Sequence, residues 1–124
     1  MSEEIRQGIL DLNFLNVEFE TRIRPLADYT ESGKDEAEFM ISLNPGEKKK
    51  PLGMVASGGE LSRIMLAVKS VLADKDEVET LIFDEIDTGI SGRTAQKVSE
   101  KMAVLGKRHQ VLCITHLAQI AAMA

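Results

Sequence analysis

Asp84 and Glu85 form the pair of side chains with the clearest potential for chemistry in this chain. They follow Leu81-Ile82-Phe83, an apolar run that predicts a strand inside a parallel sheet covered on both faces. Open α/β sheets place ligands at the carboxyl ends of their strands. Adjacent carboxylates repel each other unless a cation or a developing positive charge uses them. The stretch predicts a Walker B element, in which Asp84 holds Mg²⁺ through water and Glu85 polarises the water that attacks a phosphate. An ordinary strand ending at a solvated turn explains the same pair.

Ser57, Gly58 and Gly59 open a predicted helix. Ser57 and Glu60 have the spacing of a capping box, so the serine is expected to cap the helix through the N–H of the third residue. Two residues without Cβ atoms let a phosphate approach the backbone closely, and a helix N-terminus adds free N–H groups and a positive dipole end. A plain helix start explains the serine and glutamate but not the paired glycines. The apolar positions that follow lie on one helix face: Leu61, Ile64, Met65, Val68 and Leu72.

His116 ends a second apolar strand, predicted over residues 111–115. A histidine beside phosphates can donate a hydrogen bond to the transferring group, although a lone strand-end histidine is more often a structural hydrogen-bonding residue. It follows the carboxylate pair by about thirty residues, which suits a strand–helix–strand crossover.

These stretches, in this order, resemble the C-terminal half of an ABC-type ATPase head. Residues 56–60 resemble the signature loop, residues 80–85 the Walker B strand, and His116 the switch histidine. Glu60, where transporters usually carry glutamine, and the run Asp84-Glu85-Ile86-Asp87 resemble the SMC-like branch. The D-loop counterpart comprises Thr88, Gly89, Ile90 and Ser91.

The resemblance is closer still to the RecN family of bacterial DNA repair proteins. It rests on residues 55–67, 81–93 and 115–124 and on the turn Asn44-Pro45-Gly46-Glu47, and so covers nearly the whole chain. Two residues depart from the wider ABC pattern, since Ala56 replaces the usual leucine and Ser91 the usual D-loop aspartate. Both substitutions look RecN-like, although Ser91 cannot supply a D-loop carboxylate.

The resemblance implies a paired ATPase. The signature residues Ser57, Gly58, Gly59 and Glu60 would close over ATP held by the opposing head. Asp84 would hold Mg²⁺ through water, Glu85 would orient or deprotonate water, and His116 would steady the γ-phosphate. The implied cofactors are ATP and Mg²⁺. The implied partners are DNA, a second head and the N-terminal P-loop lobe of the same protein, in the cytoplasm at the nucleoid.

The chain shows no P-loop of the form G-x-x-x-x-G-K-[ST]. The Gly-Lys pair that precedes the signature, Gly33-Lys34, is followed by Asp35, and Asp28 stands where the first glycine should be. We therefore expect a fragment that is inactive by itself. Two alternatives are a non-catalytic dimerisation or DNA-interaction module and an ABC transporter ATPase fragment. Glu60 and Asp87 argue against the transporter.

Composition limits the other classes of function. The net charge of −5 excludes a generally cationic nucleic-acid clamp, and Lys48-Lys49-Lys50 is expected to lie in a solvated loop. The single cysteine, Cys113, excludes an internal disulfide and is predicted to be an inert core residue. No signal-peptide pattern and no membrane-length apolar run is present, so no membrane partner is expected.

The predicted fold class is α/β, the C-terminal half of an ABC/SMC-type P-loop NTPase head, with a small antiparallel hairpin region followed by parallel strands and helices. Residues 1–13 would form the root helix of a coiled-coil arm, residues 14–53 an antiparallel strand region and loop, and residues 54–124 the signature, Walker B and switch-histidine lobe. The expected elements in the second region are strands 17–23 and 37–43, with Pro25 ending the first and a long turn between them.

The remaining expected elements lie in the third region. They are a helix from about Gly59 to Ala73, a strand over 80–84, and a helix after Ser91-Gly92 that buries Ala95, Val98, Met102 and Leu105 and ends at Gly106. His109 is expected to be solvated, and a last helix begins near Leu117.

Overall fold

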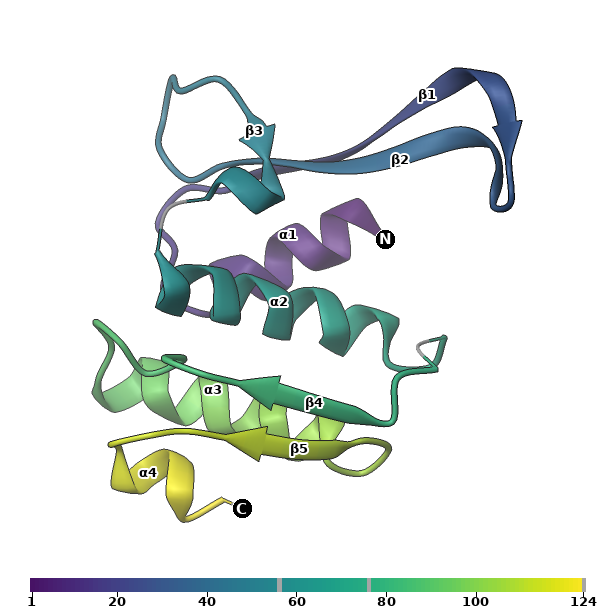
Figure 1. Cartoon of the computed structure of the whole chain (residues 1–124). Helices are drawn as coiled ribbons and strands as arrows, with labels where there is room; N and C mark the ends of the chain where they lie inside the picture. The colour runs from purple at the N-terminus through teal and green to yellow at the C-terminus, as the bar shows by residue number, and fades with distance from the viewer. Residues whose placement is uncertain (56, 76, 124) are drawn as a thin grey trace.

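The computed structural model describes residues 1–55, 57–75 and 77–123. The expectations that fall on Ala56, Asp76 and Ala124 lie outside the described residues. The fold is α/β, as predicted, with a three-stranded antiparallel sheet and a parallel pair of strands. Helices separate the two sheets (Figure 1).

The antiparallel sheet has the order β1-β2-β3, with β1 at Glu18–Thr30, β2 at Gly33–Ser42 and β3 at Lys50–Pro51. Its root is apolar, because Phe19 lies opposite Ile41 in the β1–β2 register and both side chains are buried. The Phe19 and Phe39 rings pack with their centroids 5.4 Å apart. The sheet therefore contributes to the common core only at this end.

The β1–β2 hairpin is longer than predicted, and its turn is shorter. Pro25 does not end the first strand. Because β1 is an edge strand, its outer side needs no backbone donors and a proline is tolerated there. The turn is only Glu31 and Ser32, followed by Gly33 with a φ of 114°. Ile23 is 65% exposed, and the far half of the hairpin projects beyond the helices (Figure 1).

The segment predicted as a connecting loop, 44–53, includes β3 and the start of a short 3-10 helix, η1 at Leu52–Met54. The expectation of three solvated lysines was wrong for Lys49. Its Nζ atom lies 2.5 Å from Glu20 Oε2 and 3.8 Å from Glu18 Oε2, so it ties β3 to β1 across the sheet. Lys48 and Lys50 are exposed.

The first helix, α1, runs over Ser2–Leu10, shorter than the predicted 1–13 segment. Ile5, Ile9 and Leu12 are fully buried, as an amphipathic pattern requires. Gly8 lies against α2: a Cβ atom added to Gly8 would be 3.4 Å from the Cβ atom of Ala67. A methyl group at Gly8 would therefore come into van der Waals contact with α2.

The second helix, α2, runs over Gly58–Leu72 and forms the middle of the molecule (Figure 1). Ile64 and Val68 are buried on the predicted face, but Leu66 and Ala67 are buried as well. Leu61, Met65 and Leu72 on the predicted face are only half-buried, so the buried surface of the helix is centred away from that face. It packs against α1 on one side and α3 on another.

The parallel pair consists of β4 at Thr80–Phe83 and β5 at Gln110–Cys113, joined through α3 at Gly92–Leu105. This is the predicted crossover. However, the expectation that both faces are covered was wrong. Leu81 and Phe83 are buried, whereas Ile82 is 68% exposed, because the helices cover only one face of the pair.

Helix α3 buries its four predicted apolar residues and ends at Gly106, which caps it in a right-handed conformation. His109 is not solvated: it is 8% exposed, and its Nδ1 atom lies 2.7 Å from the carbonyl oxygen of Val78. Cys113 is half-buried, and burial raises the pKa of its thiol. The last helix, α4 at Ala118–Ala121, follows Leu117. Among the described residues, no helix is both long and apolar enough to cross a membrane.

Candidate functional site

The carboxyl ends of β4 and β5 bring the predicted strand-end residues to one edge of the molecule. Asp84 directly follows β4, and His116 lies three residues beyond the end of β5. Ile114 N donates to the carbonyl oxygen of Phe83 over 3.0 Å, which extends the pairing past the last strand residues. The side chains of Asp84, Glu85 and His116 are all exposed, as ligand-binding groups must be.

Asp87 joins the two strand ends. Its Oδ2 atom accepts hydrogen bonds from Thr115 Oγ1 and from the backbone N–H of His116, both over 2.6 Å. Burial raises the pKa of this carboxyl, but the Thr115 hydroxyl and nearby backbone N–H groups outweigh burial and hold the pKa below its ordinary value. Asp87 is 9% exposed. In the sequence, Asp87 marks only the SMC-like branch, and nothing in the pattern indicates that it positions the backbone of His116.

The turn after β4 holds Glu85 in an unusual conformation. Glu85 has a φ of 55°, in the left-handed region, where a residue with a side chain costs roughly 1–2 kcal/mol. Its N–H donates to Asp84 Oδ1 over 2.8 Å, and its carbonyl oxygen accepts from Thr88 N over 3.0 Å. Such a conformation persists where surrounding contacts hold it, so the neighbours of this turn are part of the site.

The N-terminus of α2 packs on this turn. Ser57 caps the helix as predicted, since its hydroxyl accepts from Glu60 N over 3.2 Å. Ser62 Oγ donates to the carbonyl oxygen of Asp84 over 2.6 Å. Side chains from the first turns of α2 therefore both cap the helix and hold it against the end of β4.

Gly58 and Gly59 have an internal packing role that the sequence analysis did not foresee. A Cβ atom at Gly58 would overlap the Oε2 atom of Glu85. One at Gly59 would lie 2.7 Å from the Glu85 carbonyl oxygen and 2.9 Å from Thr88 Cβ. The Glu85 carboxylate thus lies against the bare backbone at the helix N-terminus, where the helix dipole favours an anion. The glycines are needed for this contact whether or not a phosphate also approaches them.

Arg63 is the second residue of the site that sequence reasoning missed. Its side chain is buried in α2, and Nη1 donates to the carbonyl oxygens of Ile86 (3.2 Å) and Thr88 (2.8 Å). Burial lowers the pKa of the guanidinium, and the charge of Glu60 partly offsets this effect. An arginine in an amphipathic helix ordinarily lies at the surface, so the sequence carried no signal for this role.

The D-loop counterpart continues the same turn. Thr88, Gly89 and Ser91 are exposed and Ile90 is half-buried. Gly89 has a φ of 74°. Ser91 occupies the N-cap position of α3, but no cap hydrogen bond from its side chain is found in the described part of the chain. The segment therefore presents mostly backbone and hydroxyl groups to solvent.

The residues at this edge of the molecule suit the binding of a phosphate better than the binding of a metal ion by protein ligands alone. The capped N-terminus of α2 offers N–H groups and a positive dipole end. Within residues 1–55, 57–75 and 77–123, no three His, Cys, Asp or Glu side chains converge as metal ligands. Asp84 supplies a single exposed carboxylate. Mg²⁺ often takes one or two carboxylates and completes its shell with phosphate oxygens and water, so Asp84 fits Mg²⁺ bound together with a nucleotide.

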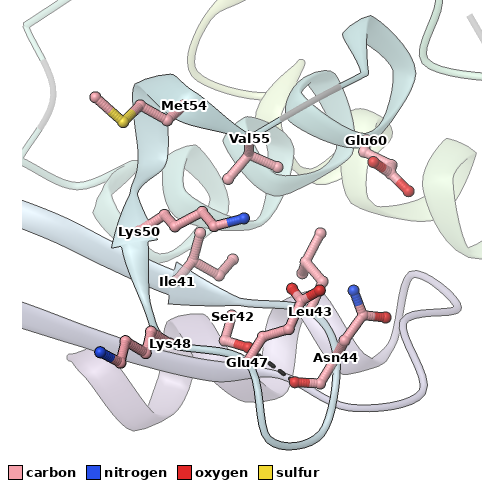
Figure 2. Close-up of a pocket in the computed structure, with 10 residues that line it drawn as sticks. All are labelled: Ile41, Ser42, Leu43, Asn44, Glu47, Lys48, Lys50, Met54, Val55 and Glu60. Atoms are coloured by element: carbon pink, nitrogen blue, oxygen red, sulfur yellow. Dashed lines mark hydrogen bonds between the residues drawn. The ribbon is translucent and has the colours of Figure 1, made fainter.

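A separate pocket of about 160 Å³ lies between the 44–50 loop and the start of α2 (Figure 2). Ser42 donates a hydrogen bond to the carbonyl oxygen of Asn44 on its wall, over 2.9 Å. Glu60 is the one predicted site residue that lines it. Since Asp84, Glu85 and His116 do not line it, this pocket is distinct from the strand-end site.

Solved structures identify the fold. An Smc head domain from Pyrococcus furiosus, described with an extended coiled coil bound to the C-terminal domain of ScpA, matches 99% of this chain and 29% of its own, with 22% identity and a TM-score of 0.62. The Smc head of Pyrococcus yayanosii gives 20% identity and a TM-score of 0.63 over 99% of this chain and 23% of its own. The fold is that of part of an SMC-type ATPase head.

Sequence relatives narrow the class to a family, although no family model matches the chain. DNA repair protein RecN is 46% identical over the whole chain in Halalkalibacterium halodurans, 61% over 74% of it in Treponema pallidum, and 57% over 77% of it in Bacillus subtilis. The chain belongs to the RecN family and corresponds to a C-terminal part of its members. It spans only 23%, 16% and 16% of these three relatives.

Proposed function

We propose that this chain is the signature and Walker B lobe of an SMC-like ATPase that acts in DNA repair. One observation carries the proposal: the strand ends place Asp84, Glu85 and His116 at one edge, and the glycine-rich N-terminus of α2 packs directly on Glu85. The RecN relatives and the Smc-head fold support it. No specific observation favours a non-catalytic module or a transporter fragment.

Each strand-end residue has a role that its position suits. The exposed carboxylate of Asp84 would hold Mg²⁺ through water, and Glu85 would orient or deprotonate the attacking water. His116 donates to the γ-phosphate, and Asp87 fixes its backbone through the 2.6 Å hydrogen bond. ATP bound with Mg²⁺ supplies the phosphoryl group that is transferred to water. The remaining steps are positioning and proton transfer by these side chains.

The N-terminus of α2 and the D-loop act on a second head. Ser57, Gly58, Gly59 and Glu60 close over the γ-phosphate held by the opposing P-loop lobe, and residues 88–91 line the contact between the heads. The Glu85 carboxylate now lies against Gly58, where it would repel an incoming phosphate. Engagement of the opposing head therefore requires this carboxylate to turn away from α2.

The remaining partners belong to the whole protein. The P-loop would come from the N-terminal lobe of the same protein, and DNA contacts would lie largely outside this lobe, whose net charge is −5. A nucleoid-associated location follows from the same proposal. ATP joins two heads, and hydrolysis releases them.

The decisive experiment uses the full-length protein. We expect ATP hydrolysis that depends on Mg²⁺ and changes with added DNA. Glu85→Gln should lower kcat by at least about 100-fold while ATP binding is kept, because the base is lost and the phosphate contacts remain. Sedimentation with ATP should then show a trapped dimer. The matched control is Glu79→Gln, an exposed glutamate beside the other end of β4, which should hydrolyse ATP like the parent.

Experiments on the isolated chain test whether ATP hydrolysis requires both lobes. It should not hydrolyse ATP by itself, and addition of the N-terminal lobe should restore activity. The proposal fails if full-length Glu85→Gln turns over ATP at the parental rate, or if the isolated chain hydrolyses ATP without its partner lobe.

A further inference from the structure

Arg63 carries a buried charge whose hydrogen bonds go to carbonyl oxygens. The residue is 7% exposed, and no ion pair joins it to a carboxylate in the part of the chain that the structure describes. Its Nε atom is buried without a hydrogen-bond partner there. A buried arginine is costly unless it is paired, so this placement opposes stability and calls for another reason.

Both carbonyl oxygens that accept from Arg63 belong to the turn that carries Glu85. Nη1 reaches Ile86 O at 3.2 Å and Thr88 O at 2.8 Å, and so spans the turn just after Glu85. Glu85 itself has a φ of 55°, a conformation that a residue with a side chain keeps only where its surroundings impose it. Arg63 supplies a fixed hydrogen-bond donor to the carbonyl oxygens of this turn.

The other side of the guanidinium is held by the N-terminal segment. Arg63 Cζ lies 5.5 Å from the centroid of the Phe14 ring, within cation–π distance. Phe14 follows α1, and Leu12 beside it is fully buried. The guanidinium is thus fixed between the segment after α1 and the carboxylate turn. Gly59 completes the packing, since a Cβ atom there would lie 3.4 Å from Nη1.

We propose that Arg63 is a positioning residue for Glu85, which fixes the direction of the base by holding the carbonyl oxygens of Ile86 and Thr88. This inference rests on the proposed ATPase function. Because the Arg63 side chain is buried behind this turn, its loss should impair the chemical step and leave ATP binding nearly intact. A misplaced catalytic group typically costs one to two orders of magnitude in rate.

The test compares variants in the full-length protein. Arg63→Lys keeps the charge, but the lysine side chain is one bond shorter, so its ammonium group falls short of the Nη1 position that serves both acceptors. We expect kcat to fall roughly 10-fold with KM for ATP within about twofold. Arg63→Ala should fall roughly 100-fold. Guanidinium ion at low millimolar concentration should partly restore the alanine variant, because it can refill the vacated site, and should not restore the lysine variant. Arg22→Ala, an exposed arginine on β1, is the control.

Thermal unfolding of each variant separates positioning from folding. Rates are expressed per folded molecule, and Arg63→Lys serves as the main test if the alanine variant does not fold. The inference is overturned if both variants lose activity only in proportion to the folded fraction, or if a folded alanine variant gains nothing from guanidinium. If the parent protein is active and the Arg63→Lys variant is unimpaired, this inference fails while the proposed function stands. An inactive parent would sink the proposed function and this inference with it.

Discussion

Neighbouring glycines at the start of α2 look equivalent in sequence but are not equivalent in the structure. A Cβ atom at Gly58 would meet the end of the Glu85 side chain, which can rotate away. A Cβ atom at Gly59 would meet the Glu85 carbonyl oxygen at 2.7 Å and Thr88 Cβ at 2.9 Å, and backbone cannot move aside as easily. Gly59 is therefore the position where a side chain is least tolerated.

Gly59→Ala should destabilise the isolated chain by about 1–3 kcal/mol in urea unfolding, because overpacking against backbone exceeds the gain in helix propensity. Gly53→Ala is the matched control. Its Cβ atom would meet nothing within 4 Å, and its φ is not in the left-handed region, so we expect a change within about 0.5 kcal/mol. Equal effects from both substitutions would show that the contact between α2 and the turn is looser than described.

At the scale of elements, Asp87 couples the turn after β4 to the residues after β5. The pair of strands is short, and its ends would otherwise be held only by the last backbone hydrogen bonds. A buried carboxylate that accepts from Thr115 and His116 keeps Glu85 and His116 at one edge. The same arrangement makes stability depend on pH.

The folded-state pKa of Asp87 lies below its ordinary value, near 3.9 in unfolded chains. Its contribution should therefore be fully present above about pH 4 and lost as pH falls through the folded-state pKa. Asp87→Asn should lower the free energy of unfolding by roughly 1–2 kcal/mol at neutral pH. In this variant the urea midpoint should also fall less steeply as the pH is lowered through the acid range. Thr115→Val, which removes one hydrogen-bond donor, should reduce this pH dependence by a smaller amount. If the urea midpoint of Asp87→Asn falls in acid as steeply as that of the parent chain, Asp87 is not the source of the pH dependence.

For the whole molecule, the main feature is a parallel pair of strands with one bare face. Ile82 is 68% exposed, and the side chains of Leu112 and Ile114 are exposed as well. Ile82 lies opposite Leu112 in the register, so these apolar groups are contiguous. Contiguous exposed apolar surface favours association.

We expect the isolated chain to self-associate at high protein concentration in sedimentation velocity. Replacing both Ile82 and Leu112 by threonine should reduce association and change the free energy of unfolding by less than about 0.5 kcal/mol per site, since these side chains are already exposed and threonine suits strands. Val104→Thr, an exposed apolar site on α3, should leave association unchanged. A parent chain that stays monomeric would contradict the prediction.

Features that depend on residues close together in the sequence could be predicted, whereas features that depend on distant residues could not. The Ser57 cap, the buried face of α3 and the strand–helix–strand crossover follow from local spacing, and the structure confirms them. Pro25 was misjudged because only its position on an edge strand makes it harmless. His109 was misjudged because a neighbour distant in sequence, Val78, accepts its hydrogen bond.

The amino-acid sequence by itself determined the order of the chemical groups, the elements that carry them and the family. All of these depend on residue type and spacing along the chain. Only the tertiary structure decided that Gly59 must lack a side chain because of Glu85, that Arg63 is buried against the turn, and that Ile82 lies on a bare face. These features arise from contacts between segments distant in sequence, and local periodicity carries no information about which surfaces will meet.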